Sequence, residues 1–345
     1  MIFRRALTVA ATTTFLSVGV AAPAHAAVTP AELALRWAPV HYQDVDATGG
    51  HALGGRSDYL TGFDFDGDLS GRDNWDRAGR SAASFDAHVY YSVLATSSHW
   101  YISYFFFHPR DWTDHPFFST EHENDGEGVL FAIERDGSEY GVLRSAVTVA
   151  HDDFYSYTPA GSTWTDGREN VDGTLRTQAS PHDSYQHPVT AQETHGHGLK
   201  AYPQYQIRGG DGIVYYPSAV AEMPGGGNDR DVRYKLVDVF APGGLWAQRG
   251  TRSLFAGLGT FAGDASGDCG TGTWGCAANS ANAPWGWDDD DDLPGRGEIA
   301  TDPAKLSAEY FTVPAGQSRS YTDNPYAAES AALEKAARTL PRTTD

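Results

Sequence analysis

The sequence is poor in cysteine and in positive charge. Its 345 residues contain two cysteines, and 25 lysines and arginines stand against 45 aspartates and glutamates, which gives a formal charge of −20. A chain this acidic repels nucleic acid, and it repels anionic membranes unless a cation intervenes. The composition therefore excludes nucleic acid as a partner and suits either cation binding or simple extracellular solubility.

The motifs of several enzyme classes are also missing. The sequence has no Gly-x-Ser-x-Gly segment and no phosphate-binding P-loop. Two thiolates are too few for a zinc site without neighbouring histidines. Outside the cell an even number of cysteines favours pairing, so we predict a disulfide between Cys269 and Cys276 that closes a small loop. Such a disulfide leaves no thiol nucleophile.

Long apolar runs are absent except at the N-terminus. Arg4 and Arg5 precede the charge-free residues 6–22, and Ala24-His25-Ala26 then supplies a signal-peptidase site. This order predicts a secretory signal peptide over residues 1–26. A transmembrane anchor is the alternative, but the Ala/Thr-rich run is weakly hydrophobic for a span. We therefore expect a secreted, extracellular monomer with no transmembrane segment in its mature form.

The remaining chain has the pattern of one β-rich domain over residues 27–345. Glycine and proline interrupt it throughout, and no alternation of strands with helices is present. This pattern predicts an all-β-dominated protein, a twisted antiparallel β-sandwich with long loops and a short C-terminal helix. The predicted helices cover residues 27–36 and 326–340. The predicted strands cover 89–94, 100–107, 128–133, 140–150, 189–193, 212–216 and 232–240, and the long loops cover 154–187, 217–231 and 241–300.

The richest group of polar residues lies between two apolar strand segments. Asp125 and Glu127 stand two residues apart, so they point the same way on an extended chain, and His122 precedes them. This donor set predicts a divalent-metal site for Mg²⁺ or Ca²⁺, with Mn²⁺ as a further option, rather than structural zinc. A solvated acidic loop is the alternative. His108 and His115 in the same window favour ligation or catalysis.

These residues resemble the motif of a known family. Phe107-x-Pro109-Arg110-Asp111 followed by His122-x-x-Asp125-x-Glu127 resembles the necrosis- and ethylene-inducing peptide-like proteins. Their heptapeptide reads Gly-His-Arg-His-Asp-Trp-Glu and follows an aromatic strand that ends in Pro-Lys-Asp. The same His-x-x-Asp-x-Glu spacing occurs in a vacuolar-sorting-protein-related family. A second landmark is the segment from His187-Pro188-Val189 to Thr194-His195-Gly196-His197-Gly198, and the family-like core covers about residues 88–240.

The resemblance has implications for fold, site and partner. It implies an actinoporin-like β-sandwich that holds a divalent cation at its mouth and engages sphingolipid headgroups on target membranes through that ion. Carried over by position, His122, Asp125 and Glu127 match the cation site, and Asp111 matches the acid after the aromatic strand, with Asp114 as its competitor. His195 and His197 are candidates to face this cluster from across the strands. The chain departs from the heptapeptide at Glu121, Asn124 and Gly126.

Two other acidic segments invite a calcium site. The segment Asp64-Phe65-Asp66-Gly67-Asp68 fails as an EF-hand, because its glycine is misplaced and Trp75 stands at the twelfth position. It is either an irregular calcium loop or a turn-rich strand edge. Asp288, Asp289 and Asp290 open a run of five acids that is either solvated or a second metal loop. Trp285 and Trp287 beside that run also suit stacking on a sugar ring.

Three functions follow from these observations. The first is a metal-dependent protein that recognises a membrane lipid headgroup or an extracellular glycan, because a bound cation supplies the positive charge that the chain lacks. The second is a metal-dependent hydrolase of phosphodiesters or polysaccharides, with His108, His115 or His195 as general base. The third is a purely structural metal ion. Whether the protein is an enzyme stays open, and the first hypothesis is preferred.

Overall fold

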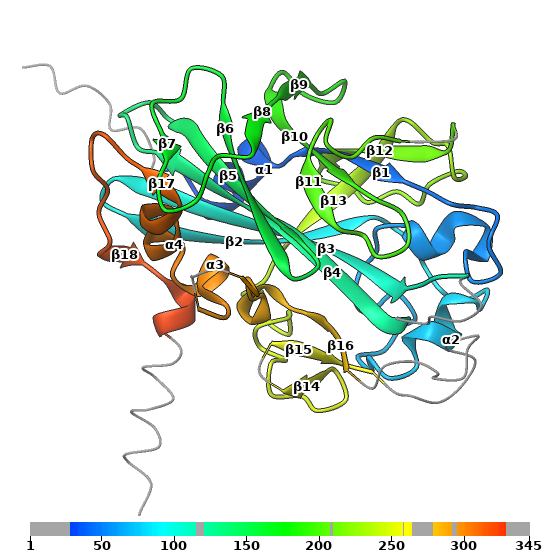
Figure 1. The fold of residues 1–345 in the computed structure, drawn as a ribbon. Coiled ribbons are helices and arrows are strands. Elements are labelled where there is room, and N and C mark those ends of the chain that lie inside the picture. Colours follow the sequence, from blue (N-terminus) through cyan, green and yellow to red (C-terminus); the bar gives the residue numbers. More distant parts are fainter. Residues whose placement is uncertain are drawn as a thin grey trace, which may run out of the picture.

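The computed structural model describes residues 28–114, 121–207, 210–257, 259–263, 279–291 and 295–328. Within these ranges the chain is mostly β, as the sequence predicts (Figure 1). A sheet of thirteen strands dominates, in the order β11-β10-β1-β12-β13-β2-β3-β4-β5-β6-β8, with β18 beside β2 and β9 beside β10. Smaller sheets pair β14-β15-β16 and β17-β7. The predicted signal peptide, both cysteines and His115 lie outside the described residues.

The predicted strand segments are all present, as β2, β3, β4, β5, β10, β12 and β13, with ends shifted by a few residues. The strands are β1 (Val40–Asp44), β2 (His88–Thr96), β3 (His99–Asp111), β4 (His122–Glu134), β5 (Val142–Ala150), β6 (Asp153–Pro159), β7 (Thr165–Asp166), β8 (Gly173–Leu175), β9 (Thr177–Ala179), β10 (Gln186–Gln192), β11 (Leu199–Ala201), β12 (Gly212–Ser218), β13 (Val232–Asp238), β14 (Phe255–Gly257), β15 (Thr260–Ala262), β16 (Asn279–Asn282), β17 (Phe311–Thr312) and β18 (Tyr321–Asp323). The helices are α1 (Pro30–Trp37), η1 (Leu53–Asp58), α2 (Asn74–Ala78), η2 (Pro284–Gly286), α3 (Glu298–Thr301) and α4 (Pro303–Tyr310).

The pairing differs from the antiparallel sandwich that the sequence predicts. β2 to β6 form an antiparallel series, but the pairs β1–β10, β12–β13, β13–β2 and β6–β8 are parallel. The dominant sheet is therefore mixed. It curves until β11, at one end, contacts β5 near the other, so it is nearly closed (Figure 1). Alternation along a strand tells which face is buried, but it does not tell which distant strand lies beside it.

Helix α1 begins where its capping residues predict. Thr29 Oγ1 accepts the Glu32 backbone N–H at 3.2 Å, and Glu32 Oε2 accepts the Thr29 N–H at 2.8 Å, which together form a capping box. Leu33, Ala34 and Trp37 are buried on one side. The helix packs against β2, β10 and β13, so it covers part of the sheet.

The regions predicted as long loops contain short regular elements. Residues 154–187 hold most of β6 together with β7, β8 and β9, and residues 241–300 hold β14, β15, β16 and η2. Most of these are two to four residues long, too short for a periodic pattern to show. The predicted C-terminal helix starts in a helical segment at 325–328, and its remainder lies outside the described residues. The described residues contain no helix that is both long and apolar enough to span a membrane.

Candidate functional site

The predicted metal residues lie on strands β3 and β4 and not on a loop. The two strands pair antiparallel along their whole length, and Asp111 lies opposite His122, while His108 lies opposite Asp125. The sequence suggested a strand–loop–strand connection here. The ladder instead extends as far as Asp111, because the polar side chains find partners in the segments packed over them. We call residues 106–111 of β3 and 122–127 of β4 the polar end of this ladder.

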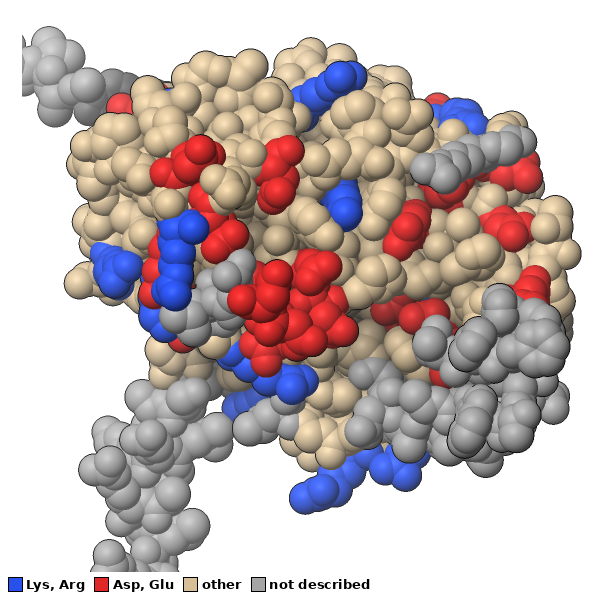
Figure 2. Space-filling model, in the orientation of Figure 1, with Lys and Arg blue, Asp and Glu red and all other residues tan. Residues whose placement is uncertain are grey.

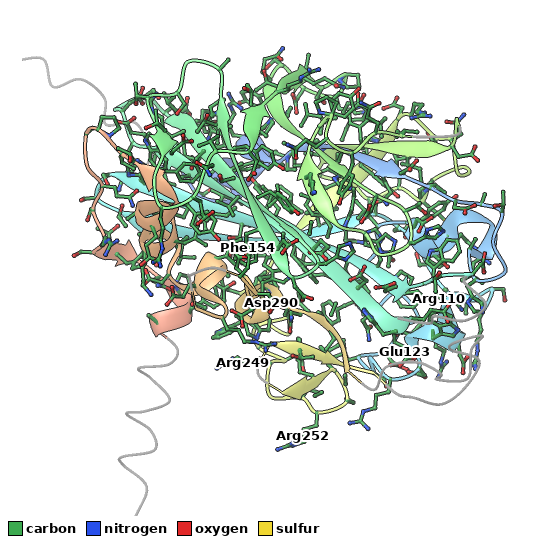
Figure 3. The ribbon with its side chains drawn as sticks, in the orientation of Figure 1. Arg110, Glu123, Phe154, Arg249, Arg252 and Asp290 are labelled. Atoms are coloured by element: carbon green, nitrogen blue, oxygen red, sulfur yellow. The ribbon has the colours of Figure 1, made fainter. Side chains whose placement is uncertain are left out.

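One side of the polar end faces helix α2. Asn124 has a φ of 60°, outside the strand range, and both Glu123 and Asn124 bond toward this helix and the loop before it. Glu123 Oε1 accepts the Trp75 backbone N–H at 3.1 Å, and Asn124 Nδ2 donates to the Gly71 carbonyl at 2.7 Å. Arg110 lies beside Glu123 (Figure 3), and its guanidinium stacks 4.2 Å from the centroid of the Trp75 ring. This side is structural.

The other side of the polar end opens into a pocket. Its cavity volume is about 630 Å³, which falls in the range of small-molecule sites. The walls come from β3, β4, the turn after β5, the segment after β10, and residues 281–287. The lining residues are Asp111, Trp112, Thr113, His122, Asp125, Gly126, Glu127, His151, Asp152, Glu193, Thr194, His195, Gly196, Ala281, Asn282 and Trp287.

All four residues predicted as metal ligands line this pocket. His122 Nε2 lies 3.3 Å from Asp111 Oδ2. Glu127 Oε1 accepts the His151 backbone N–H at 2.9 Å, whereas Glu127 Oε2 is shielded from solvent and accepts no hydrogen bond from the described residues. Asp125 Oδ2 faces inward to His197 Nδ1 at 2.7 Å. The pocket therefore offers several carboxylate oxygens, one of them without a hydrogen-bond partner among the described residues, together with the His122 imidazole. This donor set fits a divalent cation that prefers oxygen ligands.

The ligand atoms surround the pocket loosely. Among the described residues, two other groups of acids bring three ligand atoms within 4.8 Å of one another, and these four residues do not. Mg²⁺ usually keeps several waters and binds through one or two carboxylates. The spread of the ligands therefore suits a hydrated ion better than one enclosed by protein atoms alone.

Burial, with a smaller contribution from neighbouring acids, raises the pKa of two of the pocket carboxyl groups. Burial raises the pKa of Asp111 to about 7; His122 opposes this shift and Asp125 adds to it. Burial likewise raises the pKa of Glu127 well above its usual value, and Asp125 adds to that shift too. A nearby cation favours the ionised form of a carboxyl group. A bound cation would therefore oppose the rise in the pKa of Asp111 and Glu127.

At the end of the aromatic strand Asp111 lines the pocket, and Asp114 does not. Asp114 is exposed and does not line the pocket. Its carboxylate instead accepts the backbone N–H groups of Gly50 at 3.2 Å and His51 at 3.4 Å. It holds the loop after β1 in place.

A buried chain of charged groups supports Asp125 from behind. His197 is fully buried; it donates from Nδ1 to Asp125 Oδ2 and from Nε2 to Asp58 Oδ1 at 3.1 Å. Burial works to lower the pKa of His197, but the hydrogen bonds to Asp125 and Asp58 outweigh it and raise the pKa to about 10. His197 is therefore an imidazolium between two carboxylates, which fixes the orientation of Asp125.

Asp58 is the hub of this support. Its buried carboxylate also accepts hydrogen bonds from Trp112 Nε1 at 2.8 Å and from the His195 N–H at 3.1 Å. Thr194 Oγ1 donates a hydrogen bond to the Asp58 carboxylate at 2.8 Å, and the Asp46 backbone N–H donates another at 2.9 Å. It thereby joins η1, the end of β1, β3 and the segment after β10 behind one pocket.

The histidines proposed as catalytic lie in different surroundings. His108 is fully buried behind the pocket, stacked on His197 at 3.8 Å between ring centroids, and burial followed by His197 holds its pKa well below the usual value. It does not line the pocket. His195 does, and its Nε2 lies 3.3 Å from Asp46 Oδ2. Of the two candidates that lie within the described residues, His195 is the one that reaches the pocket.

Strained backbone gathers around the same pocket. Of the five non-glycine residues of the described chain that have positive φ, His151 and His195 line the pocket and His197 lies directly behind it, while Asn124 lies on the α2 side of the same strand end. Each such conformation costs on the order of 1 kcal/mol and persists only where the surroundings impose it. Such residues concentrate at functional sites.

Several pocket residues were missed in the sequence. Asp58 belongs to no motif, and His151 and Glu193, whose side chains pair at 2.9 Å, are far apart in the chain. Trp287, by contrast, was singled out by the sequence as a stacking platform for a sugar; it lines the pocket and donates from Nε1 to the Gly126 carbonyl at 2.9 Å. Trp285, predicted beside it as a sugar platform, is packed among core aromatic rings. For Asp58, no local signal existed.

The second predicted metal loop is reorganised. Asp289 groups with Asp153 and Asp291, whereas Asp288 and Asp290 stand outside that group. Figure 2 shows a dense acidic patch on this face, in the region where Figure 3 labels Asp290. Asp289 is buried and accepts hydrogen bonds from the Phe154 backbone and from the Tyr310 hydroxyl. Asp292 lies outside the described residues.

Comparison with known proteins gives a distant likeness. No family model matches this sequence, and no curated protein does. Among solved structures it is similar to NLPPya in complex with glucosamine, at 17% identity and a TM-score of 0.32, over 81% of this chain and 89% of that one. It is also similar to the non-toxic HaNLP3 protein, at 19% identity and a TM-score of 0.26, over 50% and 79%.

A third similar structure is Necrosis and Ethylene inducing Protein 2 from the causal agent of cocoa's Witches Broom disease. Its identity is 17% and its TM-score 0.23, over 45% of this chain and 65% of that one. These structures belong to the kind of protein whose motif the sequence resembles. TM-scores of this size are too low to carry a functional assignment.

Proposed function

We propose that this protein is a secreted, divalent-metal-dependent recognition protein that binds the sugar-bearing headgroup of a membrane lipid, or a related extracellular glycan, in the pocket at the polar end of β3 and β4. The observation that carries the proposal is the convergence of Asp111, His122, Asp125 and Glu127 on one open pocket. Glu127 there has a buried oxygen without a hydrogen-bond partner among the described residues.

A cation in this pocket would solve an electrostatic problem. The pocket is lined by carboxylates from several elements, so it repels an anionic headgroup directly. Asp111, His122, Asp125 and Glu127 would hold a partly hydrated Mg²⁺ or Ca²⁺, and the ion would supply the local positive charge. The paired side chains His151–Glu193 and His195–Asp46 offer donors and acceptors for sugar hydroxyls at the same pocket.

The test measures binding with and without metal. The purified chain is sedimented with vesicles that contain a glycosylated sphingolipid, in Mg²⁺ or Ca²⁺ and in excess chelator, and free glucosamine is tried as a competitor. We expect chelation to abolish binding and Asp125→Asn to weaken metal affinity by about 10-fold or more. Asp114→Asn is the matched control, because it removes the same charge from an exposed residue outside the pocket. Binding that survives both chelation and Asp125→Asn contradicts the proposal.

A metal-dependent hydrolase is the second candidate. The observation in its favour is the presence of two histidine–carboxylate pairs beside the predicted metal ligands, with His195 or His151 placed to serve as general base. Turnover of a panel of phosphodiesters and polysaccharides, lost in Glu127→Gln and in chelator, supports this function over recognition alone. A structural metal would instead lower the melting temperature on removal and leave vesicle binding unchanged.

A further inference from the structure

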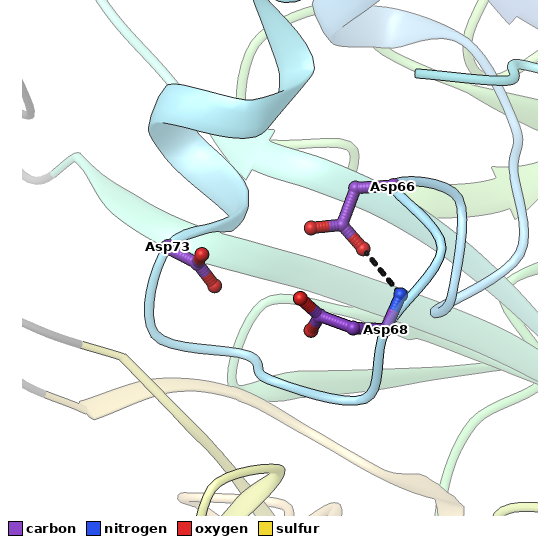
Figure 4. Close-up of side chains that lie close together, drawn as sticks. All are labelled: Asp66, Asp68 and Asp73. Atoms are coloured by element: carbon purple, nitrogen blue, oxygen red, sulfur yellow. Dashed lines mark hydrogen bonds between the residues drawn. The ribbon is translucent and has the colours of Figure 1, made fainter. Parts of the chain in front are cut away.

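A second group of acids lies on the other side of the polar end, in the loop before α2. Asp66, Asp68 and Asp73 each bring a ligand atom within 4.8 Å of the other two (Figure 4). This loop overlaps the segment that fails as an EF-hand by sequence. Asp64 does not belong to the group in the folded chain. Asp73, which lies next to the first residue of α2, does.

Two carboxylate oxygens in this group lack hydrogen-bond partners. The Asp66 side chain is only 3% exposed; its Oδ1 accepts the Asp68 backbone N–H at 3.2 Å. Asp66 Oδ2 and Asp73 Oδ1 are shielded from solvent and accept no hydrogen bond from the part of the chain that the structure describes. Figure 4 shows the Asp66 carboxylate directed into the space between Asp68 and Asp73. Buried polar atoms normally have partners, so such orphans call for an unseen ligand.

Arg77 neutralises only part of this charge. Its Nε donates to Asp73 Oδ2 at 2.9 Å, but it stays 3.8 Å from Asp66 Oδ2, and its NH2 group lies 4.0 Å from Asp68 Oδ2. Those two distances exceed a hydrogen bond. Three carboxylates and one guanidinium leave two uncompensated negative charges, the charge that a divalent cation balances.

We propose that Asp66, Asp68 and Asp73 bind a calcium ion, at a site separate from the His122 pocket. Oxygen ligands on an irregular loop that is open to water at Asp68 suit Ca²⁺, which accepts six to eight oxygens in irregular geometry, with waters completing the shell. Mg²⁺ demands near-octahedral geometry and gives up its waters reluctantly, so it suits this loop less well.

The position of the loop predicts what the ion does. Between Asp68 and Asp73, Gly71 donates its N–H to the Ser253 carbonyl at 2.8 Å and accepts Asn124 Nδ2 at 2.7 Å. Calcium would fasten this loop, and with it α2, against β4. The ion therefore stabilises the wall behind the polar end.

The experiment compares variants of equal charge. The purified chain is stripped with chelator and titrated with Ca²⁺ alone by calorimetry, and its melting temperature is followed with and without Ca²⁺. Asp68→Asn/Asp73→Asn should bind one ion fewer than wild type and lose the corresponding part of the calcium-induced rise in melting temperature. Asp64→Asn/Asp76→Asn is the matched control, since both residues are exposed and neighbour the group without belonging to it.

The outcomes separate this site from the pocket. Asp125→Asn/Glu127→Gln should keep the loop's calcium, so failure of the proposed pocket function leaves this result intact. If Asp68→Asn/Asp73→Asn binds as many calcium ions as Asp64→Asn/Asp76→Asn and shows the same thermal shift, the group is an ion-pair network around Arg77 only, and the proposal is overturned. Absence of any calcium binding by the wild type overturns it as well.

Discussion

The two halves of the β3–β4 ladder are buried equally but by different means. In the apolar half, residues 100–105 of β3 pair with 128–133 of β4, and Ile102 and Phe131 there are fully buried. In the polar end, His108 and Asn124 are just as buried. The first half is stabilised by removing apolar surface from water, at about 25 cal/mol per Å². The second depends on a nearly complete set of hydrogen bonds, because each unsatisfied buried group costs about 1–3 kcal/mol.

The difference between the two halves supports the proposed location of the site on this sheet. An apolar continuation of the ladder would have avoided the cost of burying His197, Asp58 and Asp125 together. The polar end instead concentrates strained backbone, charged hydrogen bonds and an open pocket. Proteins depart from local packing rules mainly at functional sites.

The largest expected effect is at the hub of the polar end. Asp58→Asn removes one of the two carboxylates that hold the His197 imidazolium and places a donor among groups that themselves donate. We expect the free energy of unfolding to fall by about 3–5 kcal/mol, since a buried charge loses its partner. Urea unfolding followed by fluorescence measures this change.

A neighbouring acid provides the control for that change. Asp46→Asn removes the partner of the partly exposed His195, and a pair of that kind is worth at most about 1 kcal/mol. Equal effects of the two substitutions would show that the hub has no special weight, and that the polar end is no more tightly coupled than the surface.

The two halves of the ladder can also be compared through the pKa values of two buried histidines, one at each end. The pKa of His197 under the polar end is raised to about 10, whereas burial lowers the pKa of His99, at the start of β3, to about 4. Unfolded His99 takes up a proton near pH 6.5 and folded His99 only near pH 4. The unfolded state therefore binds more protons between these values, and His99 costs stability as pH falls.

The measurement is the pH dependence of unfolding. His99→Gln should reduce by about 2 kcal/mol the stability that the protein loses between pH 7 and pH 4. The exposed His182 pairs with Asp231 at the surface, so His182→Gln should change that loss by less than about 0.5 kcal/mol. An unchanged acid profile in His99→Gln would mean that His99 is protonated in the folded protein.

The smallest effect belongs to the apolar half. Ile102→Val deletes one buried methylene and should lower the free energy of unfolding by about 1 kcal/mol. The affinity of the pocket for Mg²⁺ or Ca²⁺ should stay the same, because Ile102 does not line the pocket. Titration calorimetry on the variant checks this. A change in metal affinity would show that the two halves of the ladder are coupled.

Sequence reasoning located much of the ladder and part of the site. Runs of β-forming residues and the turn signals between them predicted β2, β3, β4 and β5, and the spacing of Asp125 and Glu127 placed these two side chains on one side of a strand. That inference is local, so it survived although the segment proved to be strand and not loop. The short strands β7, β8 and β9 were missed because two or three residues carry no period.

What the sequence determined by itself is the acidic charge, the β-rich pattern and the residue types of the pocket. Spacing within one strand is enough to set which side chains share a face. Only the tertiary structure decided that the sheet is mixed and that His151, Glu193 and Asp58 meet behind or beside His122. The tertiary structure also determined that Asp73, and not Asp64, joins Asp66 and Asp68 in the acidic group before α2. Those choices depend on pairing and packing between segments far apart in the chain, for which neither composition nor period carries information.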